Sequence, residues 1–394
     1  MFSNKTIESL KNSSWIRAMF EEGNKLRKLY GDENVYDFSL GNPDVEPPKA
    51  VKEAISKIAI SDKKGMHKYM SNGGYDSTKN AVANMISKEY KMDIPSTNIC
   101  MVTGAAAGLN VVFKSILNPT EEVIVFKPFF AEYLFYITHS NGVPVIVDTI
   151  KDTFQIDLNS FEKAITKNTK AIILNSPNNP TGVIYDQKTL EQMASIIKKK
   201  ELQYDSNIFV ISDEPYSKIV FGDIILPIIF HIFDKAISVN SYSKSLAIPG
   251  ERIGYITISP KIPDTNLLMS AILFNNRTLG FVNAPAIQQR IVEMCINERI
   301  NPQIYEERRD ILYNHITNLG FQCQKPEGAF YLFVKSPIPN EIEFVKKAQE
   351  YNILIVPGRG FGQEGYVRLT FCISLDVIKR SLPAFSKLAK EYFN

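Results

Sequence analysis

The chain has 394 residues, of which 44% are hydrophobic and 22% charged, and its formal net charge is +3. This length predicts two domains, and the dispersed charge argues against a nucleic-acid-binding protein, which needs a concentrated basic face. The four cysteines form neither a CxxC pair nor a disulfide framework. No apolar signal segment or membrane-spanning run is present, so we expect a cytoplasmic protein that binds neither nucleic acid nor membrane.

The pattern of apolar and polar residues predicts the elements in chain order. Helices are predicted over 5–30, 49–60 and 77–90, with an extended, proline-containing segment over 35–48. Short apolar runs then alternate with helical patterns such as 105–117 and 187–200. The runs are Ile99–Val102, Val123–Phe126, Val143–Val147, Ala171–Leu174, Ile208–Ile211, Ala236–Val239 and Gly254–Ile258. This alternation predicts an α/β protein built on a mostly parallel sheet.

The pattern changes near residue 285. We expect one long helix over 285–318, then strand-like segments over 328–334, 353–357 and 366–372 and a final helix. These features predict a smaller α+β unit. The chain is therefore expected to divide into an N-terminal arm over 1–45, a large domain over 46–285 and a small domain over 286–394.

Polar loops follow several predicted strands, and open α/β sheets bind ligands at the carboxyl ends of their strands. "TGAAAG" (103–108) leads into a helix whose first N–H groups suit an anion. "NSPNNPTG" (175–182) is a rigid turn that holds Asn179, and "SDEPYS" (212–217) carries Asp213. Tight strand–helix packing explains the first pattern as well, and a plain turn explains the second.

The loop after Ala236–Val239 carries the strongest signal. In "NSYSKSLAIPGERIGY" (240–255), Lys244 lies among hydroxyl groups and Arg252 follows eight residues later. Hydroxyls and a guanidinium suit a phosphate dianion, and a lysine amine is a nucleophile toward an aldehyde. A solvated surface lysine is the alternative, although it fits poorly directly after a buried strand.

Two other patterns carry no function. "GFGQEG" (360–365) matches GxGxxG, but it precedes a strand-like run instead of a helix, so it does not predict dinucleotide binding. The four histidines are scattered without ligand spacing, and no metal site is predicted.

Taken together, these segments resemble the class I/II aminotransferases, which are pyridoxal-5′-phosphate-dependent enzymes of fold type I, and among them the aspartate aminotransferases. The resemblance rests on "SYSKSLAIPGERIGY", "NNPTG" and "SDEPY" in the family's order, and it extends from about residue 35 to residue 390. It implies a large domain with a mixed, mostly parallel sheet and a smaller α+β domain that includes the N-terminal arm.

The resemblance also implies roles for individual residues. Lys244 would carry the cofactor as an imine and move the substrate's α-proton, Asp213 would pair with the pyridinium nitrogen, and Tyr216 would hydrogen-bond the ring's phenolic oxygen together with Asn179. The other implied cofactor contacts are Ser241, Ser243, Arg252 and the backbone N–H groups of Ala105 and Ala106 at the phosphate, Phe130 over the ring, and Tyr69 from a neighbouring subunit. The implied contacts to the substrate carboxylate are Gly41, Asn179 and Arg368.

The implied activity is transfer of an amino group from an L-amino acid to a 2-oxo acid such as 2-oxoglutarate, by a homodimer with shared active sites that serves amino acid biosynthesis. Aspartate is the first choice, with alanine or an aromatic amino acid as alternatives. Arg277 is the candidate for a distal carboxylate, whereas Ala106 stands where one aspartate subgroup has a lysine. A C–S β-lyase with the same cofactor, and a non-catalytic module that senses the cofactor, remain alternative functions.

Overall fold

The computed structural model describes residues 2–4, 6–7, 10 and 15–393. Helix α2 (Trp15–Tyr30) confirms the C-terminal part of the helix predicted over 5–30, of which residues 5, 8–9 and 11–14 lie outside the described part of the chain. Helices α3 (Lys49–Ala59) and α4 (Asp76–Tyr90) confirm the next two predicted helices.

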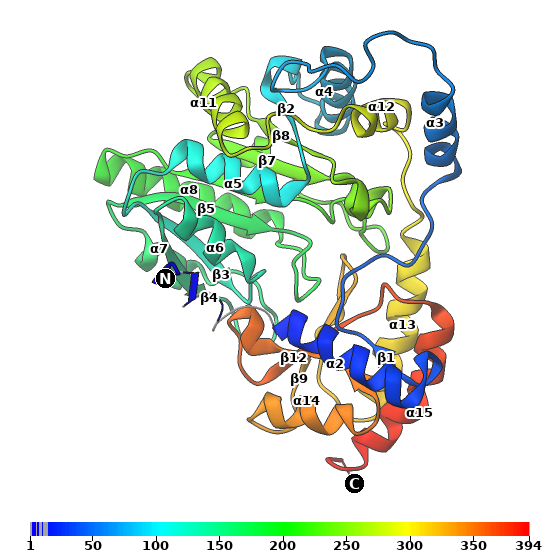
Figure 1. Cartoon of the computed structure of the whole chain (residues 1–394). Coiled ribbons are helices and arrows are strands. Elements are labelled where there is room, and N and C mark those ends of the chain that lie inside the picture. Colours follow the sequence, from blue (N-terminus) through cyan, green and yellow to red (C-terminus); the bar gives the residue numbers. More distant parts are fainter. Residues whose placement is uncertain (1, 5, 8–9, 11–14, 394) are drawn as a thin grey trace.

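A seven-stranded sheet forms the centre of the larger of the two units of the chain (Figure 1). Its strand order is β2-β8-β7-β6-β5-β3-β4. Each predicted apolar run is a strand of this sheet. The strands are β2 (Ile99–Val102), β3 (Glu122–Lys127), β4 (Val143–Asp148), β5 (Thr169–Asn175), β6 (Phe209–Asp213), β7 (Ala236–Ser241) and β8 (Gly254–Ile258). Only β8 runs antiparallel to its neighbours, so the sheet is mixed but mostly parallel, as predicted.

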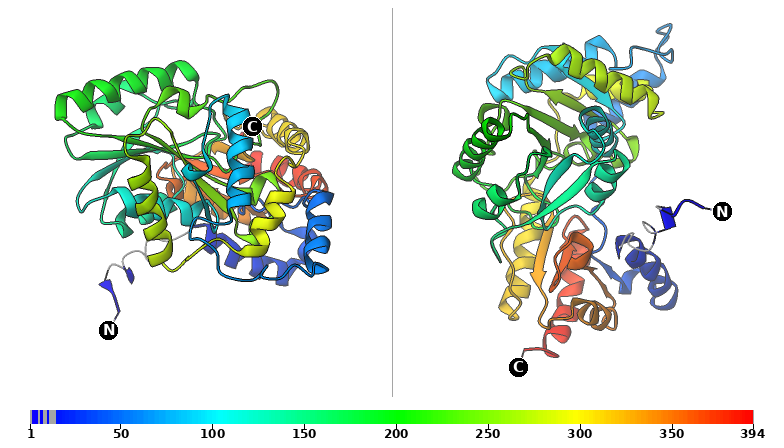
Figure 2. Two further views of the ribbon diagram at one scale, coloured as in Figure 1. Left: turned by 90° about the horizontal axis from the view of Figure 1, so that it is seen from above. Right: turned by 90° about the vertical axis from the view of Figure 1, so that its left-hand side faces the viewer.

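Helices cover both faces of this sheet (Figure 1, Figure 2) because successive strand residues point to opposite sides. In β3, for example, Ile124 packs into one core and Val125 into the other. The first core includes residues of α3, α4, α7 (Leu158–Ala164), α8 (Gln187–Tyr204) and α12 (Ala286–Met294). The second includes residues of α5 (Ala105–Ile116), α6 (Glu132–His139) and α11 (Thr265–Thr278).

A smaller unit packs below the large sheet (Figure 1) around a third core. Its antiparallel sheet has the order β11-β12-β9, with β9 (Tyr331–Lys335), β11 (Val356–Pro357) and β12 (Tyr366–Thr370). Its helices are α13 (Gln303–Asn318), α14 (Glu341–Gln349) and α15 (Leu375–Ala389). Strand β1 (Tyr36–Asp37) pairs with β10 (Ile353–Leu354), which joins the N-terminal segment to this C-terminal unit.

The single helix predicted over 285–318 is wrong. Helix α12 ends at Met294 and α13 begins at Gln303, with Pro302 as its N-cap residue. Proline disfavours helical geometry in the residue before it, and the Asn301 side chain accepts a hydrogen bond from the Gln303 N–H group. Helix α12 packs on α3 and α4, and the division at residue 285 stays a prediction.

Among the described residues, none of the helices combines the length and apolar character that a bilayer crossing requires.

Candidate active site

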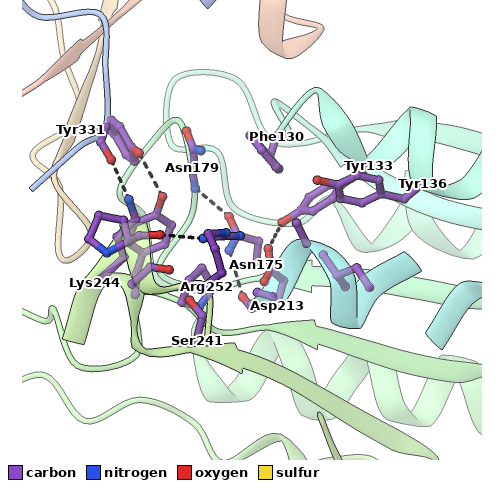
Figure 3. Close-up of a pocket in the computed structure, with 18 of the residues that line it drawn as sticks. Phe130, Tyr133, Tyr136, Asn175, Asn179, Asp213, Ser241, Lys244, Arg252 and Tyr331 are labelled. Carbon is purple, nitrogen blue, oxygen red and sulfur yellow. Dashed lines mark hydrogen bonds between the residues drawn. The ribbon is translucent and has the colours of Figure 1, made fainter. Parts of the chain in front are cut away.

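A cavity of about 290 Å³ lies at the carboxyl ends of β5, β6 and β7, where the N-terminus of α5 and the small sheet also reach it (Figure 3). Every candidate site residue except Tyr69 and Arg277 lines it. These are Gly41, Ala105, Ala106, Phe130, Asn179, Asp213, Tyr216, Ser241, Ser243, Lys244, Arg252 and Arg368. The loops after the strands therefore converge on one site, as predicted.

Lys244 enters the cavity from α10 (Tyr242–Ser245), the short helix after β7. Its Nζ donates a hydrogen bond to the Gly41 carbonyl oxygen at 2.6 Å and lies 5.3 Å from the centre of the Phe330 ring. The pKa of this amine is lowered to about 8, mainly by burial; the nearby guanidinium groups of Arg368 and Arg252 contribute to the decrease, and Cys372 opposes it. Roughly a tenth of the amine is therefore unprotonated at pH 7, far more than for an ordinary lysine, and a nucleophile or a base requires this unprotonated form.

Asp213 is the last residue of β6 and faces the same cavity. Its Oδ2 accepts a hydrogen bond from the Tyr133 hydroxyl at 2.5 Å, whereas its buried Oδ1 has no partner among the described residues. Burial raises the pKa of Asp213 to about 7, the bond from Tyr133 opposes this rise, and the neighbouring Glu214 adds to it. A buried carboxylate oxygen without a partner suits a cationic group on a ligand.

The other end of the cavity is suited to an anion. Helix α5 begins at Ala105 after Gly104, which has a φ of +89° and offers no side-chain cap, so the first N–H groups of the helix are open to a ligand. The Arg252 guanidinium packs against Gly104, where an added Cβ would lie 2.7 Å from Nη2. Glycine is needed here both for its conformation and for this close approach. Ser241 and Ser243 line the same cavity.

Arg368 reaches the cavity from β12 in the small unit. It is 2% exposed, and its Nη1 and Nη2 donate to Asn179 Oδ1 at 3.1 Å and to the Ser39 carbonyl oxygen at 2.6 Å. Within the described part of the chain, its Nε has no partner and no carboxylate pairs with it. A buried guanidinium without a counter-ion is costly, so it suits a carboxylate ligand better than a structural ion pair.

Aromatic rings hold this guanidinium in place. The Tyr331 and Phe361 ring centres lie 4.5 and 4.7 Å from the Arg368 guanidinium carbon. The Tyr331 hydroxyl is also 3.0 Å from the Tyr216 hydroxyl, and a methyl group added to Gly41 would overlap it. Gly41 therefore lets the N-terminal segment approach Tyr331 closely.

Hydrogen bonds tie the strand-end loops to one another. Asn175 accepts a bond from the Asn179 N–H at 2.8 Å and donates one to the Asp213 carbonyl oxygen at 2.9 Å. The Asn178 side chain holds the turn through the N–H and hydroxyl groups of Thr181. The positions of Asn179 and Asp213 are thus coupled through buried polar contacts.

Several lining residues were not predicted, among them Tyr133, Tyr136, Asn175 and Tyr331. Tyr133 follows Phe130 by three residues, a spacing that places both on one side of the chain as it enters α6, and this signal was available in the sequence. Tyr331 belongs to the small unit, and no local pattern indicates its position.

Two candidate residues do not line this cavity. The Tyr69 side chain is 90% exposed. Arg277 is exposed near the end of α11, where its guanidinium lies 5.7 Å from the centre of the Phe274 ring. Neither residue reaches the site of its own chain.

The layered fold and this arrangement of lysine, acid and arginines at one cavity define the class of the protein, an α/β enzyme with its site at the carboxyl ends of the strands. Residues 33–385 match the family model "Aminotransferase class I and II", and the chain therefore belongs to this family and is an aminotransferase. The predicted fold class is confirmed by solved aminotransferase structures.

The similar proteins carry related names. The chain is 31% identical over 354 residues to an aspartate aminotransferase of Thermotoga maritima, covering 89% of this chain and 90% of that one. It is 31% identical to a probable N-acetyl-LL-diaminopimelate aminotransferase of Bacillus subtilis, covering 89% of this chain and 88% of that one. A solved amino transferase from Eubacterium rectale has a TM-score of 0.96 at 36% identity, with 100% of this chain and 99% of that chain covered.

Proposed function

We propose that this aminotransferase uses pyridoxal 5′-phosphate and transfers the amino group of an L-amino acid, with aspartate the first choice, to a 2-oxo acid such as 2-oxoglutarate. The observation that carries the proposal is one cavity that holds both the Lys244 amine, whose pKa is lowered, and the Asp213 carboxylate, whose Oδ1 has no partner among the described residues. The donor set fits the cofactor, because it offers an amine for the aldehyde, an acid for the pyridine nitrogen and an anion site for the phosphate.

When bound, this cofactor supplies an aldehyde that condenses with amines and a ring that withdraws electrons from the substrate's α-carbon. Asp213 would hold a proton on the ring nitrogen through its free oxygen. Tyr216 and Asn179 would hydrogen-bond the phenolic oxygen, and the Phe130 ring would cover one face. The phosphate would be held by Ser241, Ser243, Arg252 and the N–H groups of Ala105 and Ala106.

On the substrate side, Arg368 would bind the α-carboxylate in a bidentate manner, with Gly41 and Asn179 beside it. The Lys244 amine would then remove the α-proton from the substrate and deliver this proton to the cofactor. Its lowered pKa supports this role, because a base works best when its pKa lies near the working pH.

Aspartate is supported by the names of the relatives and by no residue within the cavity. A dicarboxylate needs a second cation, and the cations lining the cavity of the described chain are Lys244, Arg252 and Arg368, which already have roles. We propose that Arg277 of a second copy supplies this cation. The exposed Tyr69 is accessible to a second copy, which supports the proposal of a homodimer with shared sites. We also propose that the enzyme acts in the cytoplasm and serves amino acid biosynthesis.

The proposal is tested with purified protein and a panel of amino acids offered with 2-oxoglutarate. We expect glutamate to form fastest with aspartate and the bound cofactor to give a visible absorption band. Lys244→Ala should lose both the band and the activity, whereas Lys188→Ala, on the exposed face of α8, should keep them. A band that survives in Lys244→Ala would contradict the proposal, and pyruvate and ammonia formed from cystathionine at a higher rate would favour the β-lyase.

A further inference from the structure

Two adjacent acids at the end of β6 face different cavities. Asp213 lines the active site, while Glu214 lines a second cavity together with Tyr90, whose hydroxyl donates to Glu214 Oε2 at 3.1 Å. Because side chains alternate along a strand, the Asp213 carboxylate has only active-site neighbours to orient it.

The neighbour that contacts this carboxylate is Tyr133 of α6 (Figure 3). Its hydroxyl donates to Asp213 Oδ2 at 2.5 Å, and its side chain is 2% exposed. The ring packs edge-on against Phe130, with ring centres 5.5 Å apart at 85°. Burial raises the pKa of the Tyr133 phenol well above its usual value, so the hydroxyl stays protonated and acts as a donor.

A hydrogen bond to one oxygen of a carboxylate determines where the other oxygen points. In Asp213 the second oxygen, Oδ1, is buried and has no partner among the described residues, although burying such an atom is costly. The cost is understandable if Oδ1 is reserved for a ligand and the bond from Tyr133 keeps it in place.

We propose that Tyr133 is a positioning residue that acts through Asp213: its hydroxyl holds Oδ2 so that Oδ1 faces the cavity, ready for the protonated ring nitrogen of the cofactor. This inference rests on the proposed function and assigns a role that the signature motifs do not carry. Tyr133 lies 80 residues from Asp213 in the sequence.

The same bond favours the charged form of Asp213. The titratable groups that interact electrostatically with Asp213 are Tyr133 and Tyr136 from α6, Tyr216 from its own turn, and the neighbouring Glu214 on the far side of the strand. Lys244 and Arg252 line the same cavity. Burial raises the pKa of Asp213 to about 7, and the bond from Tyr133 opposes that rise. Removing the Tyr133 hydroxyl therefore raises the pKa of Asp213 further. As the pH falls, Asp213 then becomes protonated at a higher pH than it does in the wild type.

The test compares Tyr133→Phe with wild type in the full-length protein freed of cofactor. We expect pyridoxal 5′-phosphate to bind about tenfold more weakly, the lower end of what a hydrogen bond to a charged group contributes. The pH below which cofactor binding weakens should rise by about one unit. Tyr305→Phe is the matched control, because the Tyr305 hydroxyl is equally buried but has no partner in the described part of the chain. It should bind as wild type does.

A double-mutant cycle with Asp213→Asn separates positioning from packing. If Tyr133 acts through Asp213, adding Tyr133→Phe to Asp213→Asn should change the affinity less than about twofold, because coupled residues are not additive. Equal losses in both backgrounds, or no loss in the single variant, would overturn the inference.

An infrared titration of the cofactor-free chain gives a readout that needs no cofactor. The infrared band of the protonated Asp213 carboxyl is identified by its absence in Asp213→Asn. This band should titrate at higher pH in Tyr133→Phe than in wild type, and an unchanged titration would overturn the inference. If wild type fails to bind pyridoxal 5′-phosphate while this titration moves as expected, the proposed function fails and the contact between Tyr133 and Asp213 stands.

Discussion

At the scale of single residues, the buried cations of the site determine both ligand binding and stability. Arg368 and Lys244 come from segments far apart in the sequence. Burial lowers the pKa of both groups, and the Arg368 guanidinium also lowers the pKa of Lys244. Such groups are costly in the free protein, and the cost is offset only when an anion or an aldehyde binds.

Arg368→Ala is expected to raise the KM for every amino acid substrate by about 100-fold, because a bidentate, buried charge pair with the α-carboxylate is lost. Steady-state kinetics with three unrelated amino acids measures this. Arg380→Ala, an exposed arginine paired with Asp376, serves as the control and should leave KM unchanged. A loss confined to one substrate would contradict a general carboxylate role.

Lys244→Met is expected to stabilise the cofactor-free chain at pH 7 by about 2 kcal/mol, less than the full pKa shift implies because the side chain is partly exposed to the cavity. The folded-state pKa of about 8 lies below the usual 10.5. The unfolded chain therefore binds more protons between these values, and wild-type stability rises with pH through that window. Urea unfolding at pH 7 and at pH 10.5 measures the difference, which should be largest at pH 7.

Lys188→Met is the control for that experiment and should give no gain at either pH. Equal stability of Lys244→Met and wild type at pH 7 would contradict the burial cost assigned to the amine.

At the scale of elements, alternation of apolar runs and helical patterns was enough to predict all seven strands of the large sheet, because period-two and period-3.6 patterns are local. The prediction of a single helix over 285–318 was wrong, and the reason for this is also local. Pro302 interrupts the pattern, and Asn301 supplies an N-terminal contact for α13. The signal for this break was present in the sequence, and the apolar pattern on either side outweighed it.

The start of α5 gives an element-scale prediction. Gly104→Ala should weaken binding of pyridoxal 5′-phosphate at least tenfold, because the added Cβ displaces the Arg252 guanidinium from the helix terminus. Gly222→Ala is the matched control, since Gly222 also has a positive φ but nothing lies within 4 Å of its added Cβ. Both variants should lose about 1 kcal/mol of stability from backbone strain. Equal cofactor affinity in the two variants would contradict the prediction.

At the scale of the whole molecule, the site lies where the large sheet meets the small unit. Arg368 and Tyr331 come from the small sheet, Gly41 from the N-terminal segment, and Lys244 and Asp213 from the large sheet. A movement of one unit against the other would therefore shift Arg368 and Tyr331 relative to Lys244 and Asp213, which both belong to the large unit.

The proposed homodimer is tested by mixing two inactive variants, Lys244→Ala and Tyr69→Ala. If Tyr69 completes the site of a second copy, each mixed dimer has one intact site, and re-association should restore about a quarter of wild-type activity. Sedimentation before and after mixing verifies the dimer. No recovery from mixed dimers would mean that Tyr69 serves its own chain, and an active Tyr69→Ala variant would mean that Tyr69 serves no site.

The sequence by itself determined the strands of the large sheet and which loop residues gather at their ends, because local periodicity and motif spacing carry that information. The tertiary structure alone decided that Tyr133 bonds Asp213, 80 residues away, and that Tyr331 bonds Tyr216, 115 residues away. The first contact depends on how helix α6 packs on the large sheet, and the second on how the small unit fits against that sheet. No short pattern encodes that fit, because it is the sum of many weak contacts between segments distant in the chain.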